Sequence, residues 1–229
     1  MSRSQTPAER AASAKLLSLA SHELRTPVSV VSGYLRMLQR DATLNERQRK
    51  MIDEADKACM RLAAIIGEIS EVGKLDDGRM TLQSESLDLF ALMRELAPSI
   101  DEAADRGVTL ELYGCDSRGL MRGDRAHLKT AFTSIIRAVL REQPENAVVH
   151  VQCQGLGNSV DIAVGRPETI AQHHAGPQAA FDEQRGGLGL ALPIARRVID
   201  GHGGRIWSPA GADGTAAART AVFITLPLS

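Results

Sequence analysis

The sequence predicts an α+β protein in which a helical hairpin, dimerising as a four-helix bundle, is followed by an α/β sandwich. Apolar residues recur at intervals of three and four over the first 75 residues, which is typical of paired helices. The turn-rich junction "GKLDDGRM" ends this pattern, and short β-like stretches then alternate with helical ones. These observations divide the chain into a hairpin domain at residues 1–77 and a second domain at residues 78–229.

Each helix of the expected hairpin carries one apolar stripe. Asn45 precedes the second helix and can cap its first turn. Two helices with one stripe each cannot enclose a core, so we expect a second copy of the chain to complete the bundle as a homodimer. The stripes comprise Leu17, Leu24, Val28, Val31, Leu35 and Leu38 in the first helix, and Ile52, Ala55, Cys59, Leu62, Ile66, Ile69 and Gly73 in the second.

Beyond the junction, the pattern predicts helices on one face of a mixed sheet. A Gly-Asn turn joins two of the strands, and glycines close the last helix. The expected strands lie at 80–89, 108–114, 147–155, 159–165, 205–208 and 220–228, and the expected helices lie near 90–104, 124–142 and 187–204.

The composition excludes several classes of function. Basic and acidic residues number 27 and 28, so there is no basic excess for nucleic acid or a membrane surface. No apolar run approaches the roughly 20 residues of a membrane span, and the polar N-terminus has no signal-peptide core. We therefore expect a cytoplasmic protein, with a soluble piece of something larger as the alternative. Cys59, Cys115 and Cys153 are widely spaced, which favours reduced thiols over a disulfide or a metal site.

The stretch "SLASHELRTP" places chemically active side chains inside the first helix. In the heptad register, His22 points away from the apolar stripe, and Thr26 lies one turn further on the same face. Glu23 is adjacent to His22, and Pro27 interrupts the hydrogen bonds of the helix. An exposed neutral imidazole is a nucleophile for phosphoryl groups, and a neighbouring carboxylate can orient it and accept its proton.

The motif "SHELRTP" resembles the H-box of two-component sensor histidine kinases, and the resemblance extends over nearly the whole chain. It implies that the second domain is a sandwich of the histidine kinase ATPase type. It also implies that His22 accepts the phosphoryl group with Glu23 as base. In the family's ExxT pattern, Thr26 would position the water that hydrolyses a regulator's phospho-aspartate.

The stretch "RGGLGLALPIARRV" resembles the second glycine box of that family, in which Gly186, Gly187 and Gly189 would approach nucleotide phosphates. The other nucleotide motifs have diverged. Ser134 and Ala138 occupy the two asparagine positions of the N-box, and an alanine methyl group cannot coordinate magnesium.

The first glycine box has diverged as well. Gly165 or Arg166 stands where the family has the aspartate that binds adenine. We therefore expect no tightly bound cofactor and weakened binding of Mg-ATP. The alternative is a working nucleotide site in which Asp161 or Glu168 substitutes.

These features predict a histidine phosphorelay protein that exchanges phosphoryl groups between His22 and the aspartate of a response regulator, or dephosphorylates that regulator. The expected partners are the receiver domain of a response regulator and a second copy of the chain, and another histidine kinase is a further candidate. We expect neither nucleic acid nor a metal ion to bind. Two alternatives stay open. One is an active ATP-dependent kinase core without its sensor domain, and the other is a dimeric scaffold without catalytic activity.

Overall fold

The computed structural model describes residues 7–41, 43–76, 82–173, 176–210 and 221–228 of the 229. The chain separates into two compact units, Met1–Met80 and Thr81–Ser229. The junction expected at 77–78 lies outside the described residues. Among the described residues, no helix is long and apolar enough to cross a membrane.

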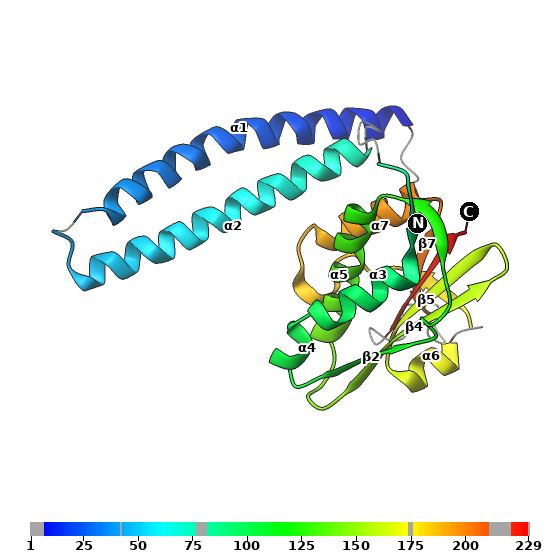
Figure 1. Ribbon diagram of the computed structural model, residues 1–229. Coiled ribbons are helices and arrows are strands. Elements are labelled where there is room, and N and C mark those ends of the chain that lie inside the picture. The colour runs from blue at the N-terminus through cyan, green and yellow to red at the C-terminus, as the bar shows by residue number, and fades with distance from the viewer. Residues whose placement is uncertain (1–6, 42, 77–81, 174–175, 211–220, 229) are drawn as a thin grey trace. The chain divides into compact units, whose positions relative to one another are not determined.

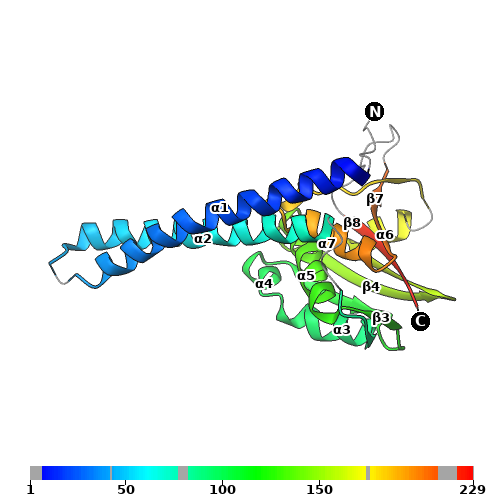
Figure 2. The same cartoon turned by 90° about the horizontal axis from the view of Figure 1, so that it is seen from above.

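The first unit is an antiparallel hairpin of two long helices, α1 (Pro7–Gln39) and α2 (Glu46–Asp76), which lie side by side along their length (Figures 1 and 2). Asn45 caps α2 as expected, and the cap is reciprocal. Its side-chain oxygen accepts from the amide of Gln48, and the Gln48 side chain accepts from the amide of Asn45, each at 2.9 Å. This pair of bonds fixes where α2 begins.

The two helices of the hairpin meet through a narrow seam. Cys59 is 3% exposed, and its Sγ lies 3.0 Å from the Ser32 Oγ and 3.5 Å from the carbonyl oxygen of Val28. Ile66 is also buried in this seam, at 5% exposure. Other apolar residues of the two helices, such as Leu24 and Leu62, stay about half exposed.

The second unit is a sheet covered on one face by helices α3, α5 and α7, which confirms the expected sandwich (Figure 1). Six strands run in the order β2-β4-β5-β8-β7-β6, with β2 parallel to β4 and the other neighbours antiparallel. β1 and β3 form a separate antiparallel pair. The strands are β1 (Glu85–Asp88), β2 (Thr109–Tyr113), β3 (Leu120–Gly123), β4 (Val148–Leu156), β5 (Ser159–Gly165), β6 (Gln178–Ala180), β7 (Arg205–Pro209) and β8 (Ala221–Pro227).

The helices of this unit depart from the expected pattern in two places. The helix expected over 90–104 is interrupted at Pro98, whose ring cannot be accommodated within an α-helix interior. The short helix α6 and the strand β6 occupy a region that had no predicted element, because neither is long enough to show a periodicity. The helical segments are α3 (Leu89–Leu96), η1 (Ala97–Ser99), α4 (Glu102–Asp105), α5 (Arg125–Arg141), α6 (Pro167–His173), η2 (Arg185–Gly187) and α7 (Ala191–Gly201).

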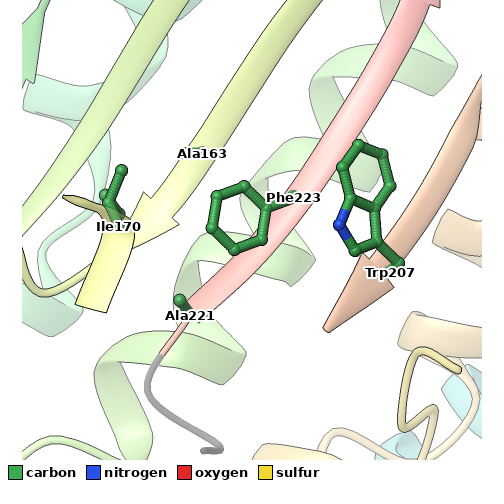
Figure 3. Packing of buried hydrophobic residues seen from close by; sticks show 5 residues of the cluster. All are labelled: Ala163, Ile170, Trp207, Ala221 and Phe223. Carbon is green, nitrogen blue, oxygen red and sulfur yellow. The ribbon is translucent and has the colours of Figure 1, made fainter. Parts of the chain in front are cut away.

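Apolar side chains fill both faces of this sheet. Leu128, Phe132 and Ile136 of α5 are fully buried on the helix-covered face. On the opposite face, Trp207 and Phe223 stack with their ring centroids 5.8 Å apart. Ile170 of α6 covers this second cluster together with Ala163 and Ala221 (Figure 3). The two aromatic residues therefore belong to the core.

Candidate functional site

His22, Glu23 and Thr26 lie together on the solvent-facing side of α1. The side chains of His22 and Glu23 are 77% and 74% exposed, and Thr26 is also exposed. Nδ1 of His22 lies 3.8 Å from Oε1 of Glu23. Because the carboxylate faces Nδ1, the second ring nitrogen, Nε2, is left free to meet a partner. The structure thus brings together the three hairpin residues that the sequence singled out.

The helix backbone next to His22 carries unusual hydrogen bonds. Pro27 lies inside α1 and has no amide to donate, so it cannot make the usual bond to the carbonyl of Glu23. Ser21 and Ser29 donate their hydroxyl groups to the carbonyls of Leu17 and Arg25, at 2.7 and 2.8 Å. Such side-chain bonds and the proline both favour bending, so the histidine stands at a deformable point of the helix.

Exposed apolar side chains cover a wide part of the α1 surface, and Leu16 and Tyr34, at 67% and 63% exposure, lie between two sets of them. At about 100° per residue, Leu19, Val30 and Met37 fall on the same side as His22 and Thr26. Their exposed fractions are 60%, 51% and 69%. The second set faces away from this side and consists of Leu24, Val31 and Leu38, at 47%, 50% and 44% exposure.

The glycine-rich segment lies in the second unit, immediately before α7. Gly186, Gly187 and Gly189 have φ values of +66°, +62° and +61°, a region that L-residues with side chains rarely adopt. The N-cap residue of α7, Leu190, makes no side-chain capping bond. The sequence therefore places its glycines where the backbone requires them.

The positions that diverge from the family's nucleotide motifs have other roles here. The hydroxyl of Ser134 donates to the carbonyl of Thr130 at 3.0 Å, and Ala138 is completely buried. Arg166 follows the end of β5, and its Nε lies 3.3 Å from Oε1 of Glu168. Among the described residues, no cluster of three or more His, Cys, Asp or Glu side chains is arranged to hold a metal.

Asp161, one of the two residues that could substitute for the missing aspartate, points to the face of the sheet opposite α5. It accepts a hydrogen bond from the hydroxyl of Thr225 at 2.7 Å. Its neighbours in β5, Ile162 and Val164, are the residues that face the helices. Because side chains alternate along β5, Asp161 lies on the face of the sheet that helices α3, α5 and α7 do not cover.

The cysteine prediction was wrong. Cys115 and Cys153 form a disulfide, with their Cα atoms 5.3 Å apart and a separation of 38 positions in sequence, and Cys59 alone is a free thiol. The pairing joins the turn after β2 to β4. Only the parallel pairing of these strands brings the two residues together, and the sequence spacing gave no sign of it.

Sequence reasoning also missed a polar cluster around the N-terminus of α5. Asp124 is 5% exposed and caps α5 by accepting from the amide of His127 at 3.0 Å, and its other oxygen accepts from the amide of Gln83 at 2.9 Å. Nδ1 of His127 lies 2.8 Å from that second oxygen. The amide of Asp124 itself donates to Nε2 of His202, also at 2.8 Å.

Comparison with known proteins agrees with this architecture. Residues 12–78 match the His Kinase A (phospho-acceptor) domain. The alginate biosynthesis sensor protein KinB of Pseudomonas aeruginosa is 29% identical over 195 residues, which cover 82% of this chain and 33% of KinB. Residues 12–78 are therefore similar to the phospho-acceptor domain of histidine kinases, and most of the chain is similar to sensor proteins such as KinB.

Two solved structures share the fold. Full-length ShkA in complex with AMPPNP matches with a TM-score of 0.70 at 20% identity, over 94% of this chain and 46% of ShkA. Histidine kinase ThkA in complex with the response regulator TrrA matches with a TM-score of 0.56 at 20% identity, over 94% of this chain and 61% of ThkA. The chain spans about a third or less of the length of curated relatives such as KinB.

Proposed function

We propose that this protein relays phosphoryl groups between His22 and the aspartate of a response regulator. The observation that carries the proposal is the open geometry at His22, whose Nε2 is free while its Nδ1 faces Glu23. The proposal extends to hydrolysis of the regulator's phospho-aspartate, and it does not require ATP.

The transfer step follows from the two nitrogens of the ring. The lone pair of Nε2 attacks the phosphorus of the acyl phosphate, so an N–P bond forms as the P–O bond to the aspartate breaks. The aspartate leaves as a carboxylate, and the proton on Nδ1 passes to Glu23, which leaves a neutral phospho-imidazole. Positioning and charge stabilisation supply most of the catalysis in such reactions. The regulator would bring its own magnesium ion.

The apolar set beside His22 supports docking of the regulator. Val30 and Met37 continue the face of His22 and Thr26 along α1, and both are more than half exposed. A receiver domain that covered them would bury apolar surface and place its aspartate near the imidazole. The solved complex of ThkA with TrrA supports this kind of partner.

The second apolar set supports a homodimer. Leu24, Val31 and Leu38 recur every seven residues, and on α2 Leu62 and Ile65 are 52% and 38% exposed. A second hairpin would bury these residues in a four-helix bundle while the histidine face stays open.

Thr26 would serve the reverse reaction. Its hydroxyl lies one helical turn from His22 on the same face, where it can hold a water in line with the phospho-aspartate of the docked regulator. Transfer to His22 and hydrolysis by water would then compete for the same phosphoryl group, and the ratio of their rates would set the direction of signalling.

The test is to mix the full chain with a phosphorylated regulator from the source genome and to measure acid-labile, base-stable label on this protein. We expect label on the wild type and none on His22→Ala. His127→Ala is the matched control, because His127 also has a carboxylate beside its Nδ1. The His127→Ala variant should take up label as the wild type does. Absence of label on the wild type with every regulator would contradict the relay and favour the scaffold.

A further inference from the structure

The glycine-rich segment of the second unit is packed directly onto α5. A methyl group added at Gly186 would lie 2.7 Å from the Cα atom of Ala138 and 3.1 Å from its Cβ atom. Such a separation is too short for two carbon atoms, so only glycine allows the segment to approach this closely. The backbone therefore covers Ala138, the position at which the magnesium-binding asparagine would stand.

A buried ion pair fixes this segment at its first residue. Arg185 is only 1% exposed, and its Nε donates to Oε2 of Glu142 at 3.0 Å. Its Nη1 donates to the carbonyl of Ala221 at 3.3 Å. Glu142 directly follows α5, and Ala221 begins β8, so one guanidinium joins the glycine-rich segment to a helix and to the sheet.

A second arginine holds the next residue of the segment. Arg141, the last residue of α5, donates from Nη1 to the carbonyl of Gly186 at 3.2 Å. The same guanidinium donates from Nε to Oε1 of Glu102 at 2.6 Å. The carbonyl of Gly186 is thus turned toward a cation of the protein itself.

We infer that the second unit closes its nucleotide site with its own chain, through a clamp formed by Arg185, Glu142 and Arg141. The clamp holds the glycine-rich segment against α5 in the nucleotide-free protein. The segment is therefore ordered without a bound nucleotide. A buried guanidinium and carboxylate must be separated from each other to free the segment, and separating such a pair is strongly unfavourable. This inference deepens the weakened binding of Mg-ATP that the sequence predicts, and it is independent of the proposed relay through His22.

The first test is a double-mutant cycle on the full chain that follows the melting transition of the second unit. Glu142→Leu leaves the buried guanidinium of Arg185 without its partner, and Arg185→Leu does the same to the carboxylate of Glu142, which is 13% exposed, so each should lower Tm by about 10 °C. The double variant should recover most of that loss, because both charges are then absent.

Arg196 and Glu183 are the control pair, because their side chains are 45% and 27% exposed although Nη1 and Oε1 are only 2.7 Å apart. Exposed pairs of this kind contribute little, so the corresponding leucine variants should show almost no coupling. If the coupling of the two substitutions in Tm is no larger for Arg185 and Glu142 than for Arg196 and Glu183, the proposed clamp is wrong.

The second test needs no variant and remains decisive if the single variants do not fold. Hydrogen exchange of residues 185–190 is measured in the wild type with and without Mg-AMPPNP. We expect the same slow exchange in both samples. Slower exchange on adding Mg-AMPPNP would show that the segment opens for nucleotide and would refute the inference, whatever the outcome of the relay experiment.

Discussion

The hairpin and the sandwich use charged and polar side chains in opposite ways. In the hairpin, the groups assigned to chemistry lie in solvent, with His22 77% exposed. In the sandwich, the charged group that organises the glycine-rich segment, Arg185, is 1% exposed. As the proposed phospho-acceptor, His22 would have to meet a partner protein and therefore depends on accessibility, whereas the proposed clamp depends on exclusion of water, which strengthens its ionic bonds.

The same contrast holds for apolar residues. The hairpin leaves Leu24, Val31 and Leu62 about half exposed, since two helices cannot enclose them. In the sandwich, the central residues of α5, such as Phe132 and Ile136, are completely buried against the sheet. The hairpin therefore leaves apolar surface open, whereas the core of the sandwich is already closed.

The largest effect is expected at the open apolar face of the hairpin. Leu62→Glu would place two carboxylates in the dimer interface, so the dimer affinity should fall by about 1,000-fold or more, as measured by light scattering across a dilution series. Met60→Glu is the matched control, because Met60 is 55% exposed, like Leu62, but lies on the opposite side of α2. Equal dissociation of both variants would contradict the proposed interface.

The next effect should be confined to the sandwich. Reduction of Cys115–Cys153 releases a 38-residue loop, and we expect a loss of about 4 kcal/mol in the free energy of unfolding of this unit. Denaturant unfolding with and without a reductant measures the loss, and the hairpin should not respond. Alkylation of the denatured, unreduced protein should label Cys59 alone, and labelling of all three cysteines would show that the disulfide is absent.

A smaller effect concerns the buried carboxylate at the start of α5. Burial acts to raise the pKa of Asp124, but hydrogen bonds from the amides of His127 and Gln83, and from the His127 ring, outweigh it and lower the pKa to about 2. Because the pKa of Asp124 is lower in the folded state than its ordinary value of 3.8, the ionised carboxylate stabilises the folded protein at pH values above 3.8. This contribution is lost as the pH falls toward 2.

We therefore expect Asp124→Asn to lower the free energy of unfolding by about 2 kcal/mol near pH 6. The difference from the wild type should shrink steadily below pH 4, as measured by urea unfolding at several pH values. A difference that stays constant from pH 6 to pH 2.5 would show that the side chain acts through shape and not through its charge.

The smallest effect is expected at Thr26. Thr26→Ala should slow the loss of phosphate from a phosphorylated regulator by about 10-fold, since the attacking water loses one positioning group. Transfer to His22 should change little, because the hydroxyl takes no part in it. Equal losses in both reactions would indicate that Thr26 serves docking or helix structure.

Parts of the site could be predicted from the sequence because they depend on neighbours along the chain. His22, Glu23 and Thr26 share one helical turn, and a register set by apolar residues places them on the outer face. The reciprocal cap between Asn45 and Gln48 is equally local. The glycines at 186, 187 and 189 were also recognisable, since positive φ values and a helix start are properties of a short segment.

The clamp could not be predicted in this way. Arg185 and Glu142 lie 43 residues apart, and nothing near either residue in the sequence indicates that they meet in the core. The disulfide and the outward direction of Asp161 likewise depend on which strands pair and in which register. The β3 and β6 strands are short, and they exist because β1 and β7 offer them backbone partners.

The sequence by itself determined the hairpin, the outward position of His22 and the class of the second unit, because helical periodicity and short motifs depend on residues that are close together in the chain. Only the tertiary structure decided which charged residues are enclosed, which cysteines pair and how closely the glycine-rich segment approaches α5. Burial and ionic attraction depend on distance in space, and the folded sheet brings together residues that the chain keeps about forty positions apart.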